Sequence, residues 1–166
     1  VPVCLCLDLS GSMAQVESGS YQETGRQEMI DGELYNIVTG GVTRLNELQK
    51  GIDLLFQAIR EDEAAVDAAE IAIVGFSNKA ECILDFGHIE DQKIPHLEAS
   101  GSTAMGEGVK LALNLLKERK SVYKRNGIQY YQPWLVLMTD GANNGDTATL
   151  KKAIDETCDL VNNGIV

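Results

Sequence analysis

The sequence predicts a single α/β domain with a doubly wound, mostly parallel β-sheet and helices on both faces. Three apolar runs, at 3–7, 71–76 and 134–139, have the near-continuous hydrophobicity of buried parallel strands. Segments in which apolar residues recur at helical spacing follow these runs along the chain. Strands that alternate with helices in this way are typical of a parallel sheet joined by crossover helices.

The first half of the chain is expected to form two strands of that sheet, one helix and one hairpin. After the strand at 3–7 and a polar segment, Thr43 is a suitable N-cap for a helix over 44–60. The strand at 71–76 leads through a short polar turn into an extended run at 80–86. This pair predicts a hairpin, and so one antiparallel edge strand.

The second half is expected to add a helix over 104–117, the strand at 134–139 and a last helix over 150–161. Asn163-Gly164 has the composition of a helix stop. Ile165-Val166 is then expected to open another strand. The aromatic side chains before and at the start of the strand at 134–139 are expected to pack near its entry; these are Tyr130, Tyr131 and Trp134.

Composition limits the kind of partner. The 166 residues contain 44% apolar side chains, enough to fill one core. Lys and Arg number 14 against 25 Asp and Glu, and the formal charge of −11 disfavours general nucleic-acid binding, because phosphate would be repelled. A bound divalent cation would reverse the sign of the charge locally.

The four cysteines have neither metal-ligand nor disulfide spacing. Cys4, Cys6, Cys82 and Cys158 are therefore expected to be small buried side chains in a reducing compartment. The sequence has no apolar run long enough to span a membrane and no recognisable signal peptide. We therefore predict a cytoplasmic protein without a membrane partner. Because the chain does not start with Met, the sequence leaves open whether a further segment precedes it.

Oxygen-bearing side chains gather where the predicted strands end. Asp8, Ser10 and Ser12 directly follow the first strand, Thr103 precedes a helix, and Asp140 follows the strand at 134–139. Carboxylates and hydroxyls are hard ligands that suit Mg²⁺ or Mn²⁺ better than zinc. In an open α/β sheet, this carboxyl edge is where ligands bind.

These five residues, in this order along the chain, resemble the von Willebrand factor A (vWA) domain. The metal-ion-dependent adhesion site (MIDAS) of that family uses these five positions. The resemblance extends from residue 1 to about residue 162 and implies a Rossmann-like sheet. It also implies that 1–166 is one domain lacking its last strand or strands and helix. The runs at 100–108 and 137–141 look most like bacterial intracellular vWA proteins of the tellurium-resistance type, which implies a stress-response complex.

This resemblance also implies how the site works. Ser10, Ser12 and often Thr103 would bind Mg²⁺ or Mn²⁺ directly, while Asp8 and Asp140 would act through water. The remaining coordination position would take an Asp or Glu side chain of a partner protein. The expected function is therefore metal-dependent protein binding and not catalysis.

Residues 14–42 depart from the family pattern, since its first helix usually begins soon after the metal loop. Asp31-Gly32 between apolar-containing flanks is a hairpin signal within this insertion. The insertion is either a lid or partner-contact element beside the metal, or a mobile surface loop.

Two other functions fit parts of the motif. A Mg²⁺-dependent phosphatase of the haloacid-dehalogenase type also begins with a carboxylate after an apolar strand, but its second Asp is replaced here by Ser10, which cannot act as a carboxylate acid or base. A metal-free scaffold domain that retains the motif without using it is the other alternative. The sequence has no Ser-His-Asp or Cys-His grouping that would indicate different chemistry.

Overall fold

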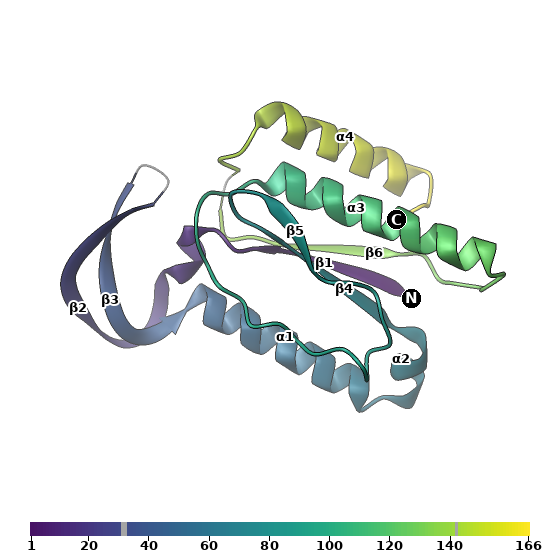
Figure 1. The fold of residues 1–166 in the computed structure, drawn as a ribbon, viewed down its shortest axis with the longest axis horizontal. Helices are drawn as coiled ribbons and strands as arrows, with labels where there is room; N and C mark the ends of the chain where they lie inside the picture. Colours follow the sequence, from purple (N-terminus) through teal and green to yellow (C-terminus); the bar gives the residue numbers. More distant parts are fainter. Residues whose placement is uncertain (31–32, 142) are drawn as a thin grey trace.

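The computed structural model describes residues 1–30, 33–141 and 143–166. Its elements form a layered body from which one β-hairpin projects (Figure 1). In chain order they are β1 (Pro2–Asp8), the 3-10 turn η1 (Gly11–Ala14), β2 (Val16–Ile30), β3 (Glu33–Thr43), α1 (Arg44–Arg60), α2 (Glu63–Ala68), β4 (Glu70–Phe76), β5 (Ala80–Leu84), α3 (Met105–Arg125), β6 (Trp134–Met138) and α4 (Thr147–Asn162).

The central sheet has the strand order β5-β4-β1-β6. β1 pairs in parallel with β4 and with β6, and β5 runs antiparallel to β4 at one edge. The predicted mostly parallel sheet with one antiparallel edge strand is confirmed. Because the chain moves from β1 to β4 on one side and later to β6 on the other, β1 lies where the strand order reverses, which is the usual ligand-binding position in such sheets.

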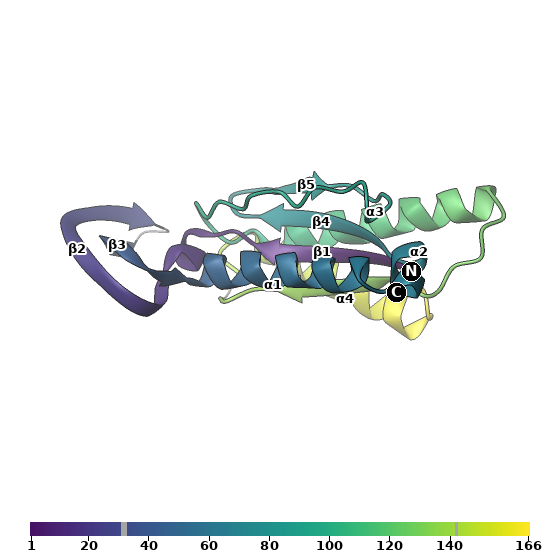
Figure 2. The same cartoon turned by 90° about the horizontal axis from the view of Figure 1, so that it is seen from below.

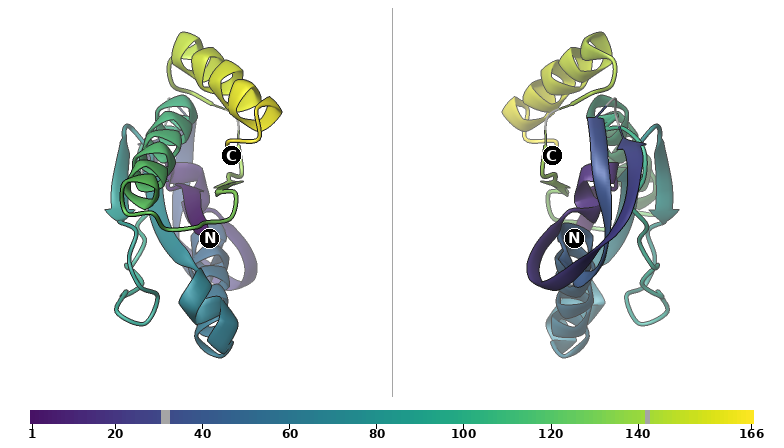
Figure 3. Two further views of the ribbon diagram at one scale, coloured as in Figure 1. Left: turned by 90° about the vertical axis from the view of Figure 1, so that its right-hand side faces the viewer. Right: turned by 90° about the vertical axis from the view of Figure 1, so that its left-hand side faces the viewer.

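Helices cover both faces of this sheet. α1 lies on one face, and α3 and α4 lie on the other (Figures 1 and 3). Alternate residues of β1 point to opposite faces: Leu5 and Leu7 pack with the α1 side, and Cys4 and Cys6 pack with the α3 side. Both β1 and β4 are almost entirely buried, as their continuous apolar sequences predict.

The helices agree with the sequence except at some boundaries. α1 has the predicted bounds and begins with a capping box between Thr43 and Asn46. α2 was not predicted, and α3 continues to Arg125 instead of ending near Lys117, because Tyr123 is buried in its last turns. Ile165-Val166 is not a strand; the Ile165 N–H bonds to the Leu160 carbonyl after the end of α4.

The predicted insertion contains the antiparallel hairpin β2–β3, whose strands pair from Val16–Thr43 to Ile30–Glu33. The turn predicted at Asp31-Gly32 lies outside the described residues. The register shifts at three places along the hairpin, which curls it away from the body (Figure 2). Gly40 and Gly41 have φ values of 85° and 78°, and an added Cβ at Gly40 would lie 3.0 Å from the Ser20 carbonyl oxygen, so glycine fits this curl.

The prediction that all four cysteines are buried is wrong for two of them. Cys4 and Cys6 are buried, but Cys82 and Cys158 are exposed, and all four are free thiols. Cys82 lies on β5, at one edge of the sheet, and its side chain is exposed. Burial raises the pKa of the Cys6 thiol to about 12 and raises that of Cys4 further, so both core thiols stay protonated.

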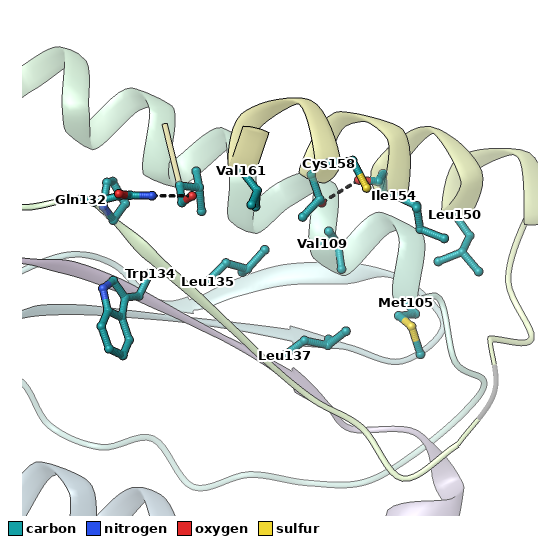
Figure 4. A pocket seen from close by; sticks show the side chains of 14 residues that line it. Met105, Val109, Gln132, Trp134, Leu135, Leu137, Leu150, Ile154, Cys158 and Val161 are labelled. Carbon is teal, nitrogen blue, oxygen red and sulfur yellow. Dashed lines mark hydrogen bonds between the residues drawn. The ribbon is translucent and has the colours of Figure 1, made fainter. Parts of the chain in front are cut away.

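β6, the other edge strand, is less buried than its sequence suggests. Trp134 is 63% exposed and Tyr131 is 74% exposed, so the expectation that they pack at the strand entry is wrong. Apolar side chains of β6, α3 and α4 line an open groove of about 720 Å³ (Figure 4). Within the described residues, no helix has the length and hydrophobicity that spanning a membrane requires.

One charged group joins the sheet to α3. Glu70, at the start of β4, accepts hydrogen bonds from the Arg119 guanidinium, with one N–O distance of 2.6 Å, and from the Tyr123 hydroxyl. Burial alone would raise the pKa of Glu70, but these hydrogen bonds outweigh it and hold the pKa below its ordinary value. They also raise the pKa of Arg119, and burial together with Glu70 raises that of Tyr123 to about 12.

We predict that Glu70→Gln lowers the free energy of unfolding by about 2 kcal/mol at neutral pH, because a charge-assisted hydrogen-bond network is lost. Since the pKa of Glu70 is depressed in the folded state, this contribution is present above its unfolded value of about 4.3 and is lost as the pH falls through the lower folded value. Urea denaturation at pH 7 and at about pH 3.5 checks this. The exposed Glu118→Gln is the control, and a pH-independent difference would contradict the prediction.

Candidate metal centre

Three loops meet at the carboxyl end of the parallel strands. The first loop, residues 9–15, follows β1; the second, residues 98–104, precedes α3; the third, residues 139–146, follows β6. Because β1 and β6 are paired neighbours, Asp8 and Asp140 leave the sheet at the same edge. The structure thereby places Ser10, Ser12, Thr103 and Asp140 on these three loops and Asp8 at the end of β1.

Ser10, Ser12 and Asp140 lie in direct contact. The two serine Oγ atoms are 3.0 Å apart, and Ser12 Oγ donates to Asp140 Oδ1 at 2.9 Å. Ser10 is fully buried, and the Asp140 side chain is 12% exposed. Three polar side chains from two loops thus converge on a site that is only partly open to solvent.

Asp8 lies behind these groups and is fully buried. Its Oδ1 accepts the Ser10 N–H at 2.9 Å, and its Oδ2 accepts the Thr139 hydroxyl at 2.6 Å. Each carboxylate oxygen is therefore already engaged by the protein. This arrangement suits a residue that orients the first and third loops.

Thr103 is 3% exposed and lies just before α3. Its carbonyl accepts the N–H groups of Asn144 and Gly145, each at 3.1 Å, so the second loop is attached to the third. These bonds fix Thr103 to the part of the third loop at Asn144 and Gly145. Ala104, not Thr103, is the N-cap of α3, and it makes no side-chain capping bond.

Backbone hydrogen bonds also attach the first loop to the second. The Gly11 N–H donates to the Gly101 carbonyl, and the Ser100 N–H donates to the Leu9 carbonyl, both at 2.8 Å. Gly101 has a φ of 71°, and Ser102 beside it donates from its N–H and hydroxyl to Asn78 Oδ1. Each pair of loops is thus directly bonded, which pre-organises the site.

Arg44 is a site residue that the sequence did not reveal. Its Nη1 lies 2.6 Å from Asp140 Oδ2, and its Nε pairs with Glu17 at the base of the hairpin. Hydrogen bonds to Asp140 and then to Glu17 raise the pKa of Arg44 above its ordinary value. Its position in the first turn of α1 gives no signal, because the contact depends on how the hairpin returns the chain to the sheet edge.

The donor atoms suit a hard divalent cation. Octahedral Mg²⁺ with oxygen ligands at 2.0–2.1 Å requires adjacent ligand oxygens about 2.9 Å apart, and the Ser10–Ser12 and Ser12–Asp140 spacings of 3.0 Å and 2.9 Å match this. Among the described residues, no group of three His, Cys, Asp or Glu side chains could hold a metal ion. Hydroxyls and carboxylates are ligands that magnesium and manganese accept.

A comparison with curated proteins found no match. Among solved structures, the chain is similar to a mutant of the PilB minor pilin from Streptococcus sanguinis, at 21% identity and a TM-score of 0.57, covering 84% of this chain and 29% of that one. It is also similar to the vWF domain of the type V pili tip protein Mfa5 from Porphyromonas gingivalis, at 18% identity and a TM-score of 0.52, covering 89% of this chain and 42% of that one.

These likenesses show the fold, and the chain spans less than half the length of either structure. A family model for the von Willebrand factor type A domain matches residues 3–143, from β1 to the third loop. The matched segment includes all five predicted site residues. The chain therefore belongs to the von Willebrand factor type A domain family.

Proposed function

We propose that this domain is a metal-dependent protein-binding module. Ser10, Ser12 and Thr103 would bind Mg²⁺ or Mn²⁺, assisted by Asp8 and Asp140. The observation that carries the proposal is the contact of Ser10, Ser12 and Asp140 at spacings that suit one octahedral cation. The bound cation would supply an electrophilic position for an Asp or Glu side chain of a partner protein.

The charges beside the proposed metal site support the proposal that the partner residue is acidic. Asp8 and Asp140 are the acidic members of the proposed site, and Arg44 already neutralises part of the charge of Asp140. A divalent cation in this setting keeps excess positive charge, which favours a further carboxylate ligand. Family membership is consistent with this proposal, since vWA folds often mediate protein interactions.

Binding is favoured over the phosphatase alternative. Ser10 stands where that class requires an acidic residue, and here its hydroxyl contacts Ser12 while its N–H bonds Asp8. A metal-free scaffold would keep the same hydrogen bonds, and the metal titration below distinguishes it from the proposed module. The family resemblance of runs 100–108 and 137–141 supports placing the module in a bacterial stress-response complex.

We predict that the chain binds Mg²⁺ and Mn²⁺ in calorimetric titration after treatment with chelator. Ser12→Ala removes one ligand oxygen and Asp140→Asn removes one negative charge, and each should weaken binding at least about tenfold, or 1.4 kcal/mol. Asp67→Asn, on the exposed surface of α2, is the matched control and should bind as the unaltered protein does. Equal affinity in all four proteins would refute the site; circular dichroism verifies that each is folded.

We also predict that Arg44→Gln raises Mg²⁺ affinity about tenfold at low salt. The guanidinium lies 2.6 Å from Asp140 Oδ2, so it repels a cation at the site and competes with it for this carboxylate. The gain should shrink in high salt. Arg26→Gln on the hairpin is the control, and weaker binding by Arg44→Gln would instead show that Arg44 holds Asp140 in its binding position.

A further inference from the structure

A groove of about 430 Å³ lies between the first loop and the hairpin. Gly11 and Ala14 of η1 line it together with residues of β2 and β3. The volume is within the range of about 300–1,000 Å³ that is typical of ligand-binding sites. The side chains that give it chemical character are Tyr21, Glu23, Tyr35 and Ile37.

We propose that this groove and the metal centre form one docking surface for an extended segment of a partner protein. The segment would carry an acidic side chain for the metal and, a few residues away, a large apolar side chain and a basic side chain for the groove. This inference rests on the proposed function and deepens it, because it states which chemistry the partner needs besides the carboxylate.

The groove is continuous with the metal centre. Gly11 lies in sequence between the two serines of the site and also lines the groove. Arg44 contacts Asp140 with one nitrogen and Glu17 of β2 with another, and its N–H bonds to the Gln15 carbonyl at 3.1 Å. The hairpin is therefore fixed at its base to the side chains of the site, so a segment that leaves the metal next meets the hairpin.

The hairpin offers apolar surface at this point. Tyr21 is 54% exposed, and Tyr35 and Ile37 are only partly buried. Tyr35 and Ile37 are two residues apart on β3, so both side chains lie on the same face of the ribbon. A two-stranded ribbon that projects from the body is only marginally stable by itself, and an apolar partner side chain would cover this face (Figure 2).

Charge distinguishes the two ends of the surface. With a cation bound, the metal end attracts a carboxylate, whereas β2 carries Glu17, Glu23 and Glu28 against the single basic residue Arg26. Glu23 lines the groove itself, so it favours a Lys or Arg of the partner. The chain's net charge of −11 also makes a basic residue beside the acidic one favourable for association.

The test is selection from a phage-displayed dodecapeptide library on the immobilised full chain in Mg²⁺, with elution by EDTA. We expect the enriched peptides to share an acidic residue and, at one constant offset within about five residues, an aromatic or aliphatic and a basic residue. The docking inference is overturned if the enriched peptides share only the acidic residue. It is also overturned if elution with EDTA releases no enriched peptides.

The strongest peptide is then measured by fluorescence anisotropy against four hairpin variants. Ile37→Ser and Glu23→Lys alter the groove and should each weaken binding about tenfold. Leu34→Ser and Glu28→Lys make the same kinds of change at hairpin positions that do not line the groove, and should change affinity less than twofold. If all four variants bind the peptide with equal affinity, the inference is overturned.

The metal titration keeps the two proposals separable. If Mg²⁺ binds and Ser12→Ala abolishes peptide binding while Ile37→Ser and Glu23→Lys do not weaken it, the docking groove fails and the metal-dependent module stands. If Mg²⁺ does not bind, or peptide binding is the same in EDTA, the metal-dependent function fails. The Glu23 side chain is exposed, so Glu23→Lys tests the groove even if Ile37→Ser disturbs the folding of the hairpin.

Discussion

The buried carboxylate of Asp8 is the group on which the geometry of this sheet edge depends. A carboxylate without solvent contact is costly unless donors surround it, and here the donors come from two different loops, at Ser10 and Thr139. Satisfying Asp8 therefore fixes the first loop relative to the third and brings Ser12 to Asp140. The parallel pairing of β1 with β6 makes this arrangement possible, since it places Thr139 beside Asp8.

Much of the fold could be predicted because local signals and the buried environment agree. The unbroken apolar runs of β1 and β4 have the composition of strands covered on both faces, and Thr43 marks the start of α1 correctly. Where apolar sequence and burial disagree, the prediction was wrong. Trp134 lies on β6, whose position at the edge of the described sheet its own sequence does not encode, and Cys82 is exposed on β5, which the sequence did predict to be an edge strand.

For the candidate site, sequence order indicated which side chains would lie close together but not all of their contacts. Ser10, Ser12 and Asp140 could be placed together because strand ends converge, whereas Arg44 and Glu17 meet them only through the path of the hairpin. Asp31-Gly32 indicated a hairpin, but the curl of β2 and β3 follows from shifts in register that no single residue announces. Contacts between distant segments are thus the part that local patterns leave undetermined.

The two ends of the hairpin leave and re-enter the domain side by side, since the N–H of Arg44 bonds to the carbonyl of Gln15. An element inserted between adjoining backbone positions can be lengthened, shortened or exchanged without moving the strands that form the core. Across evolution, the hairpin can therefore change in length and sequence while the loops at the carboxyl edge of the sheet keep their arrangement.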